Sequence, residues 1–291
     1  MNYIDLHVHS NVSDGTLSPT ELVALAQKQG LTAFALTDHD TVDGVDEALQ
    51  AAQQSSSNNM PFTVIPGTEL SASHKGKDIH ILGLYLNHKD ETLLSTLSEV
   101  SKERDRRNEK MCANLQHAGI DITMQKLREG NEEAIITRAH FARYLFEHGY
   151  VTSVKEAFHK YLDSKGPYYV SREYLSPKDA ISLIRNADGV PVLAHPLLYH
   201  LSPIELDQLV CELKGYGLEG IEAIYSCNRN LDESVVKKLA HNYDLAVTGG
   251  SDFHGSVKPD INLGSGRGNL KVYDSLLSDI RRRKPSHITT L

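Results

Sequence analysis

Short apolar stretches rich in β-branched and aromatic residues recur along the chain, and they are typical of buried strands. Between many of them the apolar positions repeat with helical periodicity. One such segment is preceded by Ser18, a typical helix-capping residue, and is followed by Gly30, a typical stop signal. This alternation of strands and helices favours an α/β fold with a parallel sheet or barrel. We expect strands at 3–8, 33–36, 62–65, 79–86, 190–193, 220–225 and 245–248.

The alternation stops between residues 91 and 162, where the pattern is helical throughout and strand patterns are absent. We interpret this part as an inserted helical subdomain. The chain then divides into a first part of the barrel at 1–90, a helical insert at 91–175 and a second part of the barrel at 176–291. A length of 291 residues suits a barrel with such an insert.

Composition and charge narrow the classes of function. Hydrophobic residues make up 40% of the chain and charged residues 23%, which excludes a disordered or fibrous protein. No apolar run approaches the roughly 18 residues of a membrane span, and the first residues lack a signal-peptide pattern. We therefore expect a cytoplasmic protein without a membrane partner. The net charge of −8 argues against binding of duplex DNA, so an anionic ligand needs a local positive site.

Fifteen histidines are many for this length, and histidine is the commonest metal-binding side chain. His7 and His9 are separated by one residue on a predicted strand, which places both imidazoles on the same face with Cα atoms roughly 6.6 Å apart. Such a pair also arises by chance on a solvent-exposed strand. The metal interpretation therefore depends on the other residues near strand ends.

Metal-binding side chains follow or lie in several further predicted strands. Because the carboxyl ends of parallel strands meet at one rim, we expect these side chains to converge there. Together with His7 and His9 they provide six imidazoles, three carboxylates and no thiolate, a set that suits Mn²⁺, Zn²⁺ or iron. The three cysteines are too scattered for a metal knuckle. The further residues are Asp14, His39, Glu69, His80, His195, Asp252 and His254.

At these residues the sequence resembles the PHP family of metal-dependent phosphoesterases. The shared blocks are a His-x-His, a Thr-Asp-His, a Gly-x-Glu, a later His, an Ala-His-Pro and a Ser-Asp-x-His, and all occur in order within residues 1–90 and 185–265. The resemblance implies a distorted (β/α)₇ barrel that binds two to three divalent transition metal ions. Manganese is the first expectation, and Fe²⁺ and Zn²⁺ are the alternatives.

The resemblance also implies how the ions are shared, with Glu69 bridging two of them. In this assignment the catalytic set is His7, His9, Glu69, His195 and Asp252. His7, His9, Glu69 and Asp252 hold one ion, Glu69, His80 and His195 hold a second, and Asp14, His39 and His254 hold the third.

The helical insert is similar to that of PHP nucleoside 3′,5′-bisphosphate phosphatases, some of which also act as 5′→3′ exoribonucleases on short RNAs. The similarity lies in Arg104-x-x-Arg107-x-x-x-Met111, Ile136 to Arg143, Ala157-Phe158-x-x-Tyr161-Leu162 and Lys165-Gly166-Pro167. It implies removal of the 3′-phosphate from small nucleoside bisphosphates and trimming of short RNAs. A histidinol-phosphate phosphatase and a non-catalytic nucleotide-binding module are the alternatives. The oligomeric state is open.

Several residues of the insert are candidates for binding substrate phosphates. Arg107 shares a helical face with Met111, Arg138 starts a helix whose amides favour anions, and Lys165 follows a turn. His140 is a candidate proton donor or phosphate ligand. Arg104 fits equally well on a solvated charged helix. Tyr225 and Phe253 are candidates for stacking on a base, although core packing suits both better.

Overall fold

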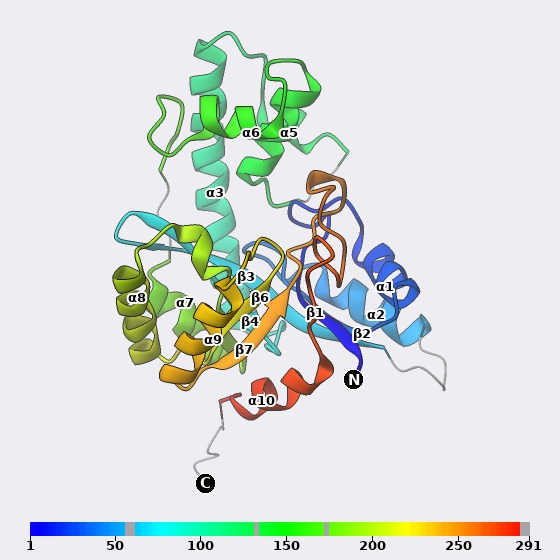
Figure 1. Cartoon of the computed structure of the whole chain (residues 1–291). Helices are drawn as coiled ribbons and strands as arrows, with labels where there is room; N and C mark the ends of the chain where they lie inside the picture. Colours follow the sequence, from blue (N-terminus) through cyan, green and yellow to red (C-terminus); the bar gives the residue numbers. More distant parts are fainter. Residues whose placement is uncertain (56–61, 131–133, 172–174, 286–291) are drawn as a thin grey trace.

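The computed structural model describes residues 1–55, 62–130, 134–171 and 175–285. In these ranges seven strands pair in chain order within one sheet (Figure 1). The first and last strands also meet, because the Asp252 amide donates to the His7 carbonyl at 2.8 Å and the His9 amide donates to the Phe253 carbonyl at 3.0 Å. The sheet is therefore a nearly closed barrel, as predicted. Its strands are β1 (Tyr3–Val8), β2 (Leu31–Leu36), β3 (Thr63–His74), β4 (Lys77–Leu84), β5 (Val190–Leu193), β6 (Gly220–Tyr225) and β7 (Ala246–Gly250).

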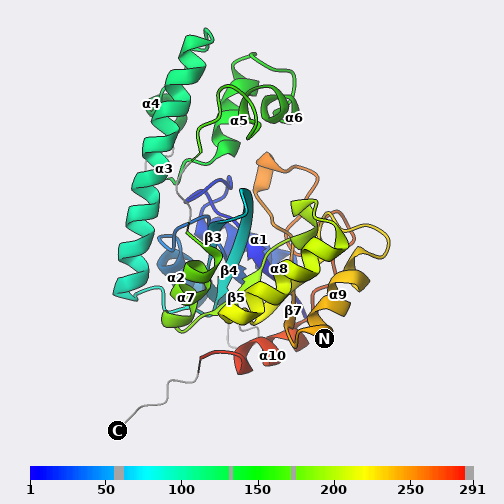
Figure 2. The same cartoon turned by 90° about the vertical axis from the view of Figure 1, so that its left-hand side faces the viewer.

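Helices cover the outside of the barrel (Figures 1 and 2). Three of them begin at Ser18, Ser176 and Ser202, whose hydroxyls accept hydrogen bonds from backbone amides of the first turn, and each has a proline at its start. The helices are α1 (Pro19–Lys28), α2 (Val45–Ser55), α7 (Pro177–Asn186), α8 (Pro203–Tyr216), α9 (Asp232–Asn242) and α10 (Leu277–Arg282), with short helical turns η2 (Pro196–Tyr199), η3 (Gly255–Val257) and η4 (Asp274–Leu276).

The inside of the barrel is apolar at one end and polar at the other. Ile4 and Leu6 pack in the inner cluster, whereas Val8 packs in the cluster under the outer helices. The register of β1 against β2 shifts between Asp5 and Val8. Since side chains alternate along a strand, this irregularity changes the face that β1 presents. As a result His7 follows Leu6 into the interior.

One expectation about the sheet was wrong. Glu69 was expected just after the end of a parallel strand, but β3 continues past it to His74. His80 was expected within a strand, and it lies in β4, which runs antiparallel to both of its neighbours. The reversal occurs at Lys75 and Gly76, which both have positive φ, as in the tight turns that suit hairpins. Glu69 and His80 therefore lie within strands, and strict alternation still directs both into the barrel.

The helical insert stands over one end of the barrel (Figure 2). Leu93 and Leu97, near the start of its first helix, pack in the barrel core, whereas Met111 and Leu115 pack with Phe141 in a separate cluster. No strand is present in the described part of residues 91–162, and no described helix is long and apolar enough to cross a membrane. The insert contains α3 (Glu91–His117), α4 (Met124–Arg128), α5 (Arg138–Glu147), α6 (Val154–Ala157) and the π-helical turn η1 (Phe158–Leu162).

Closure of the barrel depends on a glycine at the end of β7. A Cβ atom at Gly250 would come within 2.5 Å of the backbone nitrogen of His7. We predict that Gly250→Ala lowers the free energy of unfolding of the metal-free protein by about 2 kcal/mol or more, measured by urea denaturation. Gly215→Ala is the control, since its Cβ meets nothing within 4 Å in α8 and alanine favours a helix. Equal stability of the two variants would contradict this account.

Candidate metal centre

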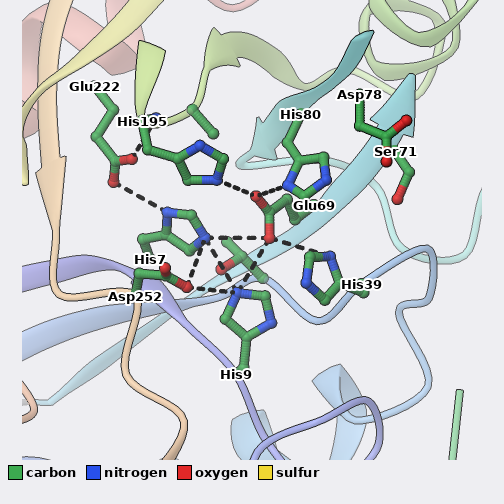
Figure 3. Close-up of polar contacts among 12 residues, drawn as sticks. His7, His9, His39, Glu69, Ser71, Asp78, His80, His195, Glu222 and Asp252 are labelled. Atoms are coloured by element: carbon green, nitrogen blue, oxygen red, sulfur yellow. Dashed lines mark hydrogen bonds and ion pairs between the residues drawn. The ribbon is translucent and has the colours of Figure 1, made fainter. Parts of the chain in front are cut away.

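A buried carboxylate lies at the centre of the site (Figure 3). Glu69 is 1% exposed, and each of its two oxygens faces a different group of imidazoles. Burial raises the pKa of Glu69, but the imidazoles of His39, His80 and His7 outweigh that effect and hold it well below its usual value. Oε2 lies 3.3, 3.2 and 3.2 Å from nitrogens of His7, His9 and His39, and Oε1 lies 2.8 and 2.9 Å from nitrogens of His80 and His195.

Asp252 faces the imidazoles of His7 and His9, which also face Oε2 of Glu69. Its Oδ1 atom lies 3.6 Å from His7 Nε2 and 3.4 Å from His9 Nε2, and these two nitrogens are 3.1 Å apart. Tyr225 and Lys258 each donate to Asp252 Oδ2 at 2.7 Å, so Oδ1 is the oxygen that faces the imidazoles. Two imidazole nitrogens and two carboxylate oxygens thus surround one point, which is an arrangement that can hold a cation.

Glu222 supports this group from β6. Its Oε1 atom lies 3.0 Å from His7 Nδ1, and its Oε2 atom accepts the backbone amide of His195 at 2.8 Å. A carboxylate on Nδ1 makes that nitrogen the protonated one and directs the lone pair of Nε2 toward Glu69 and Asp252. Glu222 was not predicted, although a lone carboxylate within an apolar strand is a signal that could have found it.

Asp14 gathers the remaining imidazoles. Its Oδ1 atom lies 3.1 Å from His254 Nε2 and 3.8 Å from His9 Nδ1, and its Oδ2 atom lies 3.8 Å from His39 Nε2. Thr137, from the insert, donates its hydroxyl to Asp14 Oδ2 at 2.8 Å. The structure therefore brings all nine predicted side chains together. His9 lies both in the group with His7 and Glu69 and in the group with Asp14 and His254. His39 lies beside both Asp14 and Glu69.

The donor set fits divalent metal ions. The Nδ1 atoms of His9, His39 and His195 are buried without a hydrogen-bond partner among the described residues. Buried polar atoms rarely lack a partner. Those of His9 and His39 face carboxylate oxygens at 3.8 and 3.2 Å, and a cation between nitrogen and oxygen would satisfy both. Nitrogen and oxygen ligands without sulfur are typical of Mn²⁺, Fe²⁺ and Zn²⁺ sites.

A cavity of about 210 Å³ adjoins this cluster on the side of the insert. Asp14, His39, His80 and His254 line one part of it. Cationic side chains line another part, so groups that bind cations and groups that bind anions share one space. The cations are Arg104, Arg107, Arg138 and Lys258.

Of these cations, Lys258 had not been singled out from the sequence, and Arg104 had been left open between phosphate binding and a solvated helix face. Arg104 is buried and paired with Asp40, rather than solvated on a charged helix. Its spacing of three from Arg107 on one helical face was the available signal. Lys258 is brought to the site by the chain after β7, and no sequence pattern marks it.

Arg107 and Arg138 line the cavity, whereas two other predicted substrate residues lie elsewhere. His140 is buried behind Thr137, whose backbone amide donates to His140 Nδ1 at 3.1 Å, so its ring caps its own helix. Burial lowers the pKa of His140 to about 4, which leaves the ring neutral at neutral pH. A neutral ring does not suit proton donation, and the other candidate role of His140, phosphate binding, stays a prediction. Lys165 is exposed in the turn after η1 and is not part of the cavity lining.

Comparison with known proteins agrees with this geometry. The profile of the PHP domain matches residues 5–175. The chain belongs to the PHP-domain family. It is 35% identical over 277 residues to a 5′-3′ exoribonuclease of Haemophilus influenzae, covering 94% of this chain and 96% of that protein. It is 36% identical over 256 residues to a 3′,5′-nucleoside bisphosphate phosphatase of Chromobacterium violaceum, covering 87% and 88%.

A solved structure extends this similarity across the whole PHP fold. The structure of an amidohydrolase from Chromobacterium violaceum with bound sulfate and no metal superposes with a TM-score of 0.86 at 30% identity. The match covers 97% of this chain and 96% of that protein. The arrangement of barrel and insert is therefore shared with that protein.

The two faces of Glu69 lead to a prediction about metal content. Glu69→Ala removes oxygens from two groups of ligands, whereas His195→Ala removes one nitrogen from one group. We predict that Glu69→Ala retains less metal than His195→Ala, measured by elemental analysis of purified protein. His74→Ala is the control, because His74 lies at the end of the same strand near Glu212 and should leave metal content unchanged. Equal metal content in all three variants would contradict a centre built on Glu69.

Proposed function

We propose that this protein is a metal-dependent phosphoesterase that removes the 3′-phosphate of small nucleoside 3′,5′-bisphosphates and trims short 5′-phosphorylated RNAs from the 5′ end. The observation that carries the proposal is the shared cavity, in which a histidine and carboxylate cluster adjoins three arginines and a lysine. The histidine and carboxylate cluster can hold cations next to the reacting phosphate. The cationic side chains can hold a further phosphate of the same substrate. The relatives named above support this pairing of activities.

In this proposal two to three divalent ions occupy the cluster, and manganese is the first expectation. Such ions acidify water to supply the nucleophile and stabilise charge on the leaving oxygen. His7, His9, Glu69 and Asp252 hold one ion, Glu69, His80 and His195 hold another, and Asp14, His39 and His254 hold a third.

The protein's own cations bind and orient the substrate in this proposal. Arg138 lies at the N-terminus of α5, where backbone amides also favour an anion, and it lines the cavity. Its ion pair with Asp78, at 3.0 Å, is partly exposed and therefore weak. A phosphate can replace that carboxylate at little cost. Arg107 also lines the cavity, and Lys165 is proposed to reach the phosphate from the turn after η1.

We predict that Arg138→Ala raises the KM for adenosine 3′,5′-bisphosphate tenfold to a hundredfold, about 1.5–3 kcal/mol for one charge-assisted contact. The KM for a small aryl phosphate should change little, because that substrate has no second phosphate. Arg143→Ala is the control, since Arg143 lies on the same helix beside Glu147 and outside the cavity lining. Equal losses on both substrates would place Arg138 at the reacting phosphate instead.

A second prediction concerns polarity on RNA. If the insert holds the terminal 5′-phosphate and the next phosphate lies at the metal centre, water would attack that phosphorus and the bond to the 3′-oxygen would break. A short 5′-phosphorylated RNA should then be shortened from its 5′ end and release nucleoside 5′-monophosphates. The matched substrate with a 5′-hydroxyl should react more slowly, as measured by gel analysis of end-labelled RNA. Because few phosphates are bound, the dependence on salt should be shallow. Equal rates on both RNAs would leave only the small-molecule activity.

The same purified protein can separate the alternative functions. A phosphate-release screen should include histidinol phosphate beside the nucleoside bisphosphates. Turnover of histidinol phosphate alone would favour a histidinol-phosphate phosphatase. Nucleotide binding without phosphate release from any substrate, in protein loaded with Mn²⁺, would favour a non-catalytic module.

A further inference from the structure

Part of the cavity lining is apolar. Most of the lining is charged or polar, but Ala139, Phe158 and Val257 are apolar. Phe158 comes from the insert and Val257 from η3 of the barrel, so both parts of the protein contribute apolar surface to the cavity. The side chain of Phe158 remains 36% exposed although it is a large aromatic group. It therefore offers ring surface to a ligand in the cavity.

The local structure explains why Phe158 is not buried. It begins the π-helical turn η1, in which hydrogen bonds join residues five apart. Ala157 and Leu162 are five apart, and both are fully buried in the core of the insert. Since those two residues occupy the face of the turn toward the core, Phe158 is left on a different face at the cavity.

We propose that Phe158 is the platform on which the nucleobase of the substrate stacks, with Val257 contributing to the same apolar subsite. This inference rests on the proposed function and adds a place for the base to it. Aromatic rings stack on any base because every base has a π-face. Arg138 lines the same cavity, so one nucleotide finds both a phosphate site and a base site there.

The other aromatic candidates do not serve this purpose. Tyr225 is buried and donates its hydroxyl to Asp252, and Phe253 is buried in the hydrophobic core. Neither is part of the cavity lining. Core packing is therefore the role of Phe253, and positioning of Asp252 is the role of Tyr225.

A binding experiment tests the platform without relying on catalysis. The chain contains no tryptophan, so Phe158→Trp introduces a single fluorescent indole at the proposed site. AMP should quench this fluorescence, whereas ribose 5-phosphate should not. The control is Phe146→Trp, because Phe146 is 46% exposed on α5 and lies outside the cavity lining. If calorimetry shows AMP binding and the indole at 158 is unaffected, the proposal is overturned.

A kinetic experiment separates stacking from a structural role. Phe158→Leu should raise the KM for adenosine 3′,5′-bisphosphate roughly tenfold or more and leave that for 1-deoxyribose 3,5-bisphosphate, which has no base, unchanged. Phe158→Tyr should retain the KM of the wild type on both. Equal losses on both substrates would show that Phe158 only supports the fold. If the wild type hydrolyses neither substrate, the proposed function fails, and the fluorescence experiment still tests the base site.

Discussion

The burial of the Glu69 carboxylate is the constraint on which the rest of the site depends. A buried charge is costly unless cationic or hydrogen-bonding groups compensate it, and five imidazoles surround this one. Those imidazoles come from widely separated parts of the chain. The barrel must therefore close before they can meet, and the close approach of Gly250 to His7 is what lets β7 reach β1. The cluster of metal-binding side chains therefore forms only when the barrel closes.

The antiparallel pairing of β3 and β4 gives Glu69 its central place. His39, His195 and Asp252 follow the ends of their strands, at the rim of the barrel. Glu69 instead lies within β3, and Leu82 of β4 is its register partner. Because the hairpin continues beyond it, His80 is held two residues further along the same face of β4 as Leu82. The departure from a regular parallel barrel thus places His80 beside Oε1 of Glu69, while Oε2 faces His7, His9 and His39.

Much of this architecture could be predicted from the sequence, and the parts that could not share a physical reason. The barrel, the helical insert and the nine side chains of the cluster follow from local periodicity, short motifs and family resemblance. The hairpin of β3 and β4 could not be predicted, because a strand pattern followed by a tight turn does not by itself give the direction of pairing. The ion pair that accompanies the burial of Arg104 joins residues more than 60 positions apart, and Lys258 lies in a segment without periodicity. Such contacts leave no local pattern.

The way the insert is held explains which of its cations remain available to a ligand. Side-chain contacts that join insert and barrel include Arg104 with Asp40, Thr137 with Asp14, and Arg138 with Asp78. The Arg104 pair is almost fully buried, and removing one partner of such a pair leaves an uncompensated charge, so this contact is structural. The Arg138 pair has both side chains about 30% exposed, where an ion pair contributes about 1 kcal/mol or less. Arg104 therefore fixes the insert over the metal centre. Arg138 can exchange the carboxylate of Asp78 for a substrate phosphate without loosening the insert.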